Sequence, residues 1–259
     1  MLSLTHHTFL CLVQLQHSYF CQLDLLKLMG LLSGLTIIGF AVLLLTQCGS
    51  TATEKCSNVN QDRIHQNYQA EYTTSNDTTS VSARFRFGDS SGTTLSTDKC
   101  NITHSSITLN ETSFLGIYYS GSKAGLVADN TFVFTDANGK VLTNSITITT
   151  IAFSSPPTSL SKASGGTISF SGGALAAGET ATVTFTSNRE GEVSTSASSS
   201  SEGATSITVS TDKVSKFANG TISMQLTRSK SKSLTEATSV GGTIYASYAA
   251  SKLDVTIAD

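Results

Sequence analysis

The sequence predicts an all-β fold of two tandem antiparallel β-sandwiches that follow an N-terminal apolar segment. Three observations lead to this prediction. After residue 48 about a third of the residues are Ser or Thr, while the helix formers Leu, Lys and Glu are scarce. Short runs alternate apolar and polar residues, which is the period of a strand with one buried face. Turn-forming Gly, Asn and Asp separate these runs, and no segment after residue 50 has convincing helical periodicity.

The alternating runs extend over the whole chain after residue 61. The clearest one places Val81, Ala83, Phe85 and Phe87 on one face, and Ser82, Arg84 and Arg86 on the other. The other runs contain Phe132 and Phe134, Ile146 and Ile148, Ile168 and Phe170, Val183 and Phe185, Ile207 and Val209, Ile222 to Leu226, and Val255 and Ile257. We expect each run to form a strand with its apolar residues in a core.

The only two prolines, Pro156-Pro157, mark the expected domain boundary, because proline cannot donate to a sheet ladder and a pair of prolines is stiff. We therefore predict domains at 61–155 and 156–259, each the size of an immunoglobulin-like sandwich. The segment 175–185 resembles the strand-entry segment of bacterial immunoglobulin-like modules, which agrees with this division. Residues 48–60 are polar and are predicted to be a flexible tether, and 1–47 to be a signal or anchor segment.

The residues Leu45-Thr46-Gln47-Cys48, which end an apolar run and precede Gly49-Ser50, resemble the lipobox of bacterial lipoproteins. The resemblance implies that the signal is cleaved before Cys48, that the Cys48 thiol carries lipid, and that the body is exported into the cell envelope. Gly49 after the cysteine favours the outer membrane over the inner one. Gln47 departs from the small residue usual at that position, so cleavage by ordinary signal peptidase and an uncleaved anchor helix over 28–45 stay open.

The first 25 residues lack the basic charge of a signal peptide, so translation could begin downstream, at Leu26 or Met29. This segment contains two His/Cys pairs with i, i+4 spacing, which zinc could use. They are His7 with Cys11 and His17 with Cys21. Because the segment is expected to be untranslated or removed, no metal site is predicted.

Once the precursor is trimmed, two cysteines besides Cys48 are left, Cys56 and Cys100. In an exported protein such a pair suggests a disulfide. A loop of this length would stabilise the fold by about 4 kcal/mol on the chain-entropy model.

No catalytic motif is present, and after residue 48 the only histidines are His65 and His104. The nearest approach to a cluster is Asp98 with Cys100 and His104. We therefore expect neither an enzyme nor a cofactor. Two sequences that resemble the start of a calcium loop, 136–139 and 89–92, are expected to be Gly-containing turns instead.

Three further segments are candidates for partner contacts. Arg228, Lys230 and Lys232 alternate and are expected to lie on a solvated strand edge, with lipid phosphate, anionic glycan or nucleic acid as alternatives. No interleaved aromatic residues support nucleic acid, so no nucleic-acid partner is expected. The tyrosine pairs Tyr118/Tyr119 and Tyr245/Tyr248 could be exposed or could pack in a core. Apart from these candidates, the segment 194–201 is predicted to be a low-complexity loop.

These observations favour a lipid-anchored envelope protein of the non-enzymatic binding or adhesion class, bound to membrane lipid through Cys48, with an unknown protein or glycan ligand. One alternative is a structural subunit of a surface fibre, resembling the fimbrial subunits of Bacteroidetes that assemble by strand addition. The alternating segment 253–257 could be the donated strand, or it could complete its own sheet. A second alternative is a single-pass membrane protein with a β-rich ectodomain.

Overall fold

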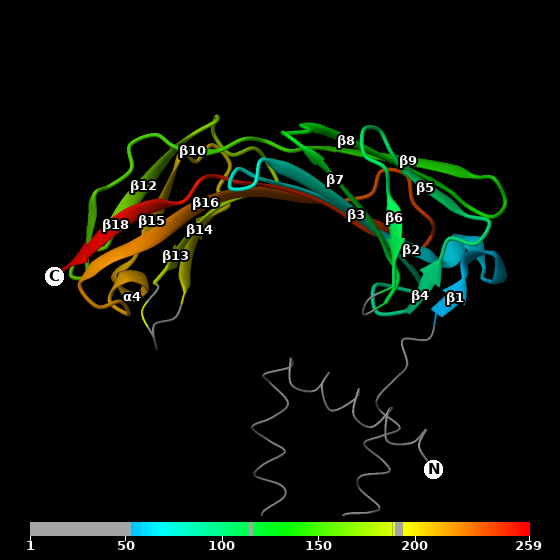
Figure 1. Ribbon diagram of the computed structural model, residues 1–259, viewed down its shortest axis with the longest axis horizontal. Coiled ribbons are helices and arrows are strands. Elements are labelled where there is room, and N and C mark those ends of the chain that lie inside the picture. The colour runs from blue at the N-terminus through cyan, green and yellow to red at the C-terminus, as the bar shows by residue number, and fades with distance from the viewer. Residues whose placement is uncertain (1–52, 114–115, 188, 190–193) are drawn as a thin grey trace, which may run out of the picture. The chain divides into compact units, whose positions relative to one another are not determined.

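The computed structural model describes residues 53–113, 116–187, 189 and 194–259, and Cys48 and the lipobox lie outside these residues (Figure 1). The described chain is almost entirely β-structure, which confirms the predicted all-β class. Its helical elements are single turns: η1 (Cys56–Asn58), η2 (Gln61–Arg63) and α4 (Thr211–Val214). Among the described residues, no helix has the length and apolar character needed to cross a bilayer.

A 12-stranded sheet runs through most of the described chain. Its strands are β1 (Thr53–Lys55), β2 (Ile64–Thr73), β3 (Thr78–Phe87), β4 (Thr93–Ser96), β6 (Asn110–Thr112), β7 (Tyr118–Ala124), β11 (Ser159–Ser161), β13 (Glu179–Thr186), β14 (Thr195–Ser199), β16 (Gly220–Ser233), β17 (Gly242–Ala249) and β18 (Leu253–Ala258).

Two smaller sheets of three strands each complete the described fold. One consists of β5 (Asn101–His104), β8 (Asp129–Thr135) and β9 (Val141–Thr147). The other consists of β10 (Ala152–Phe153), β12 (Gly166–Ser171) and β15 (Ser206–Val209).

Two hydrophobic cores lie on the same side of the large sheet, each between it and one small sheet. The first contains Tyr68 and Phe85 from the large sheet, with Phe132 stacked on Tyr68 at 4.8 Å between ring centroids. The second contains Val183 and Leu226 from the large sheet, with residues of β12 and β15. The half-buried Tyr248 packs against both cores.

The large sheet crosses the expected boundary at Pro156-Pro157. Strand β17 pairs in parallel with β2 over its whole length and contributes Ile244 and Ala246 to the first core. Strand β16 pairs with β18 at its beginning and with β17 at its end, so it extends from the second core toward the first. The immunoglobulin-like description is not confirmed, because the two cores share this one sheet. The purely antiparallel arrangement is wrong, since β1–β4, β11–β18 and β17–β2 are parallel.

Three other segments differ from their expected structure. Within the predicted tether, β1 pairs with β4 and Cys56 is 1% exposed, so residues 53–60 belong to the folded body. The predicted loop 194–201 contains β14, which pairs with β13 through its backbone. The segment 253–257 lies in β18, which pairs with β16 on one side and with β11 on the other and so completes its own sheet.

Candidate binding face

The face of the large sheet that points away from both cores is polar over seven neighbouring strands. Successive residues of a strand point to opposite faces of the sheet. The pairing registers therefore show which residues share the outward face in all seven strands, which are β7, β3, β2, β17, β16, β13 and β14. We call it the polar face. It includes Ser120, Ser122, Ser80, Ser82, Arg84, Arg86, His65, Asn67, Gln69, Glu71, Thr243, Tyr245, Ser247, Ser229, Thr227, Thr180, Thr182, Thr184, Ser196 and Ser198.

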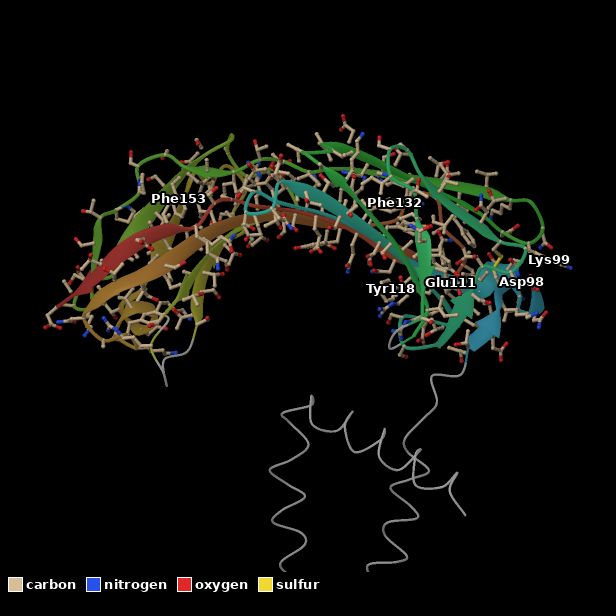
Figure 2. All side chains as sticks on the ribbon, viewed as in Figure 1. Asp98, Lys99, Glu111, Tyr118, Phe132 and Phe153 are labelled. Carbon is tan, nitrogen blue, oxygen red and sulfur yellow. A yellow bond between two sulfur atoms is a disulfide. The ribbon has the colours of Figure 1, made fainter. Side chains whose placement is uncertain are left out.

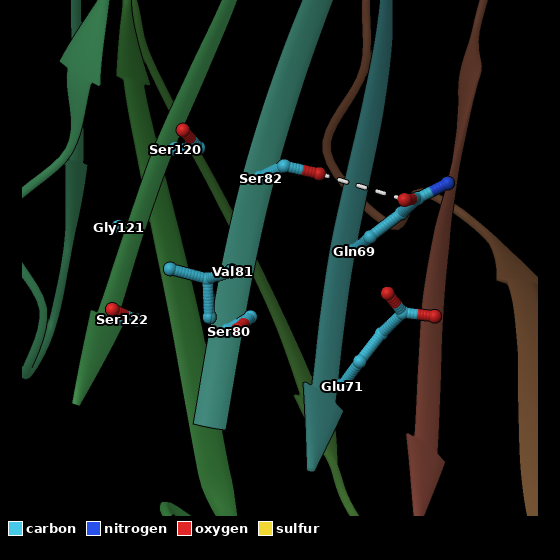
Figure 3. Close-up of a pocket in the computed structure, with 8 residues that line it drawn as sticks. All are labelled: Gln69, Glu71, Ser80, Val81, Ser82, Ser120, Gly121 and Ser122. Atoms are coloured by element: carbon cyan, nitrogen blue, oxygen red, sulfur yellow. Dashed lines mark hydrogen bonds between the residues drawn. The ribbon is translucent and has the colours of Figure 1, made fainter. Parts of the chain in front are cut away.

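One shallow hollow on the polar face, which we call the serine hollow, lies across β7, β3 and β2 and has a volume of about 350 Å³. Its lining is Gln69, Glu71, Ser80, Val81, Ser82, Ser120, Gly121 and Ser122 (Figure 3). The Ser82 hydroxyl donates to Gln69 Oε1 at 3.5 Å, and the Ser247 hydroxyl donates to Glu71 Oε1 at 3.5 Å. The serine hollow therefore offers short hydroxyl groups, one amide and one carboxylate.

A second hollow of about 220 Å³, the arginine hollow, lies further along the same two strands. It is lined by His65, Asn67, Arg84, Arg86 and Ser90. The antiparallel register of β2 and β3 places His65 opposite Arg86 and Asn67 opposite Arg84. Asn67 Nδ2 donates to Thr243 Oγ1 at 2.7 Å, which fixes the amide on β17.

The arginine hollow contains two positively charged side chains, Arg84 and Arg86. The Arg84 guanidinium lies over the Tyr118 ring at 5.9 Å, and Figure 2 shows Tyr118 on β7. In the part of the chain that the structure describes, neither Arg84 nor Arg86 has an ion pair with a carboxylate. Burial and the charge of Arg86 lower the pKa of His65, and Asp89 opposes this shift. Asp89 is itself held in its turn by the Ser91 amide and hydroxyl, both 2.7 Å from Asp89 Oδ1.

The expected solvated basic edge is wrong for Arg228, whereas Lys232 is exposed near the end of β16. Strand β16 is paired on both sides, and Arg228 is only 4% exposed because it continues the inward series of Met224 and Leu226. Its guanidinium forms a buried ion pair with Glu179 and donates to the carbonyls of residues 172 to 174 at 2.9 to 3.0 Å. Arg228 therefore stabilises the fold beside the second core by joining β16 to Glu179 and to the loop before β13.

The predicted disulfide between Cys56 and Cys100 is present, with the two Cα atoms 6.1 Å apart. Figure 2 shows it beside Asp98 and Lys99. The buried Gln61 supports it: its amide donates to the carbonyls of Cys56 at 2.6 Å and Val59 at 2.8 Å, and its Oε1 accepts from the Ala137 amide at 3.0 Å. These contacts attach η1 to the β8–β9 turn.

The other candidate residues do not form a reactive site. Asp98 bonds Ser57 Oγ at 3.0 Å, whereas His104 Nε2 pairs with Asn130 Oδ1 at 3.1 Å, so the suggested cluster with Cys100 does not converge. Asp136 Oδ1 accepts from the amides of Asn138 and Lys140 at 2.8 Å, and Gly139 has a φ of 84°, which makes this segment the expected turn. No group of three or more metal-ligating side chains occurs within the described residues.

The tyrosine pairs divide between the two environments. Tyr119 is 4% exposed and belongs to the first core, and its hydroxyl donates to Glu111 at 2.9 Å. Tyr118 and Tyr245 lie on the polar face, while Tyr248 packs against the cores. The sequence shows that Arg84 and Arg86 share a face, but their pairing with His65 and Asn67 depends on the register of the β2–β3 hairpin. The turn-forming residues 75–77, which lie between β2 and β3, are the sequence signal for this hairpin.

No family model matches the chain, and no curated protein matches it. Among solved structures, the adhesin InvE of Yersinia pseudotuberculosis is similar at 12% sequence identity and a TM-score of 0.21, with 77% of this chain and 60% of that chain covered. The chain thus spans about three fifths of the adhesin chain it matches. A TM-score this low does not establish a shared fold.

Proposed function

We propose that this chain is a non-enzymatic binding protein of the cell envelope that holds a glycan on its polar face. The observation that supports it is the composition of this face: seven adjacent strands present hydroxyl and amide groups outward, while both cores lie on the other side. In this proposal the lipobox-like segment supplies the attachment, through lipid on Cys48.

A glycan fits this face better than other classes of partner. Stable protein interfaces have an apolar centre, and the outward positions here are mostly Ser and Thr. A nucleic-acid surface needs a broad basic stripe, and the two arginines here share the face with Glu71. Sugars present many hydroxyl groups that both donate and accept, and Ser, Thr, Asn and Gln side chains match both roles. Tyr118 and Tyr245 add rigid aromatic surface.

Replacing Tyr245 and Gln69, which face each other across β17 and β2, with alanine is expected to weaken glycan binding at least tenfold. The purified full-length chain is tested on two immobilised probes, dextran and hyaluronan. Surface plasmon resonance measures its affinity for each. Val141→Ala is the control, since Val141 is 53% exposed on β9, away from the polar face. Equal binding by the control, the double variant and the native chain would contradict the proposed face, and no retention on either polysaccharide would contradict the function.

The proposed anchor has its own test. Intact-mass measurement of the protein from its native membrane is expected to give a chain that begins at Cys48 and carries two or three acyl chains. Two or more chains are needed, because a single acyl chain gives only marginal membrane binding. An unmodified chain that retains residues 28–45 would instead make it a single-pass membrane protein.

A further inference from the structure

We infer that the arginine hollow binds the acidic group of the glycan, so that the ligand is a polysaccharide whose carboxylate-bearing sugars alternate with neutral ones. This inference rests on the proposed function and names the ligand class for the same face. It starts from two guanidinium groups, Arg84 and Arg86, that line one hollow and have no carboxylate partner among the described residues.

The groups around the arginine hollow are suited to a carboxylate oxygen pair. A guanidinium is always charged and presents its donors in a planar fork that matches a carboxylate. Asn67 and Ser90 add neutral polar groups at the rim, and Tyr118 stacks against Arg84. Asp89, the nearest acidic residue along the chain, is held by Ser91 and forms no ion pair with either arginine among the described residues, although its charge acts on His65.

The position of the arginine hollow relative to the serine hollow favours a linear ligand. Outward residues follow each other along β2 as His65, Asn67, Gln69 and Glu71, with Arg86, Arg84, Ser82 and Ser80 opposite them on β3. Six residue-to-residue steps of extended chain lead from His65 to Glu71, a track of roughly 20 Å. This track is basic at one end and hydroxyl-rich at the other.

Glu71 at the far end of the track disfavours a second acidic group there, because like charges repel. An acidic sugar at the arginines, followed by a neutral sugar at Ser80 and Ser82, would pair with the guanidinium groups and would avoid repulsion from Glu71. Hyaluronan, in which a uronate alternates with a neutral amino sugar, has this pattern and serves as the probe.

The test compares the full-length chain with Arg84→Gln/Arg86→Gln on hyaluronan, on neutral dextran and on vesicles of phosphatidylglycerol. Lys123→Gln/Lys252→Gln is the control, because it removes the same charge from exposed residues that do not line either hollow. We expect the arginine variant to lose hyaluronan affinity about 10- to 100-fold, the scale of one charge-assisted hydrogen bond. The control is expected to change affinity less than twofold, and raised salt to weaken native binding. Equal thermal midpoints of the variants exclude unfolding.

Each other outcome separates the inference from the proposed function. Unchanged hyaluronan affinity in the arginine variant, together with its loss in Tyr245→Ala/Gln69→Ala, overturns the acidic-group inference and leaves the glycan face standing. Equal affinity for dextran and hyaluronan also overturns it. Arginine-dependent binding to the vesicles without binding to hyaluronan assigns the hollow to a lipid headgroup and overturns the inference. No binding to either polysaccharide overturns the proposed function.

Discussion

Replacing Arg228 with alanine is expected to lower the free energy of unfolding by about 3–5 kcal/mol, because it leaves a buried carboxylate without its partner. Glu179 is 3% exposed, and its Oε2 accepts from the guanidinium, with Arg228 Nε at 3.1 Å. The same guanidinium supplies donors to three carbonyls of the loop before β13, which would also lose their partner. Urea unfolding at pH 7 measures the loss.

Lys232→Ala is the matched control for Arg228→Ala. Lys232 is an exposed basic residue on the same strand, so its removal is expected to change stability by no more than about 0.5 kcal/mol. A loss below about 1 kcal/mol for Arg228→Ala would show that the pair is not buried as described.

The same pair contributes to acid sensitivity. Burial raises the pKa of Glu179, but hydrogen bonds from the Ala176 amide and from Arg228 outweigh it, so the pKa lies below its usual value of 4.5. Because the folded pKa is the lower one, the stabilisation is complete above pH 4.5 and is lost as the pH falls through the folded value. The free energy of unfolding of Glu179→Gln, measured from pH 7 to pH 3, is expected to fall less than that of the native chain. An identical fall in both would contradict this role.

Removing the disulfide with Cys56→Ala/Cys100→Ala is expected to cost about 4 kcal/mol, because the unfolded chain gains the freedom that a closed loop denies it. The two cysteines are 44 residues apart in sequence. The loss should also release β1, which is three residues long and pairs with β4 among the described strands. Denaturant unfolding and hydrogen exchange of β1 measure the two effects.

A suitable control for the disulfide variant is the native chain after reduction under native conditions. Its stability is expected to match that of the double alanine variant within about 1 kcal/mol, because both lack the cross-link. Unchanged stability in both would contradict the stabilising role of the bond.

The strands were predictable wherever the sequence alternates, since a half-buried strand requires that period. The run at Val81 to Phe87 therefore gave the correct inward and outward sets, including Arg84 and Arg86. Strand β14 was missed because only Ala197 among its residues is apolar and buried. Its Ser and Thr residues carry no period, and its place depends on the backbone of β13.

The positions of Arg228 and of β17 show two different limits. Arg228 has the same parity as Met224 and Leu226, so extending that alternation would have placed it inward. The parallel pairing of β2 with β17 has no comparable local signal, because about 170 residues separate the two strands and nothing near either one specifies the other. Only the β3 side of the arginine hollow was predictable from the sequence, because the alternation placed Arg84 and Arg86 on one face. The β2 residues opposite them, His65 and Asn67, depended on the register of the hairpin.

The disulfide also decides how the chain carries mechanical load. Tension applied before Cys56 and resisted after Cys100 passes directly across the sulfur atoms, so its covalent path bypasses the backbone between the two cysteines. That segment contains β2 and β3, with both guanidinium groups and the imidazole of the arginine hollow. A protein held at its N-terminal side and pulled through β7 or β17 would thus load β2 and β3 only through the lateral hydrogen bonds of β17 with β2 and of β7 with β3, and not along their own backbones.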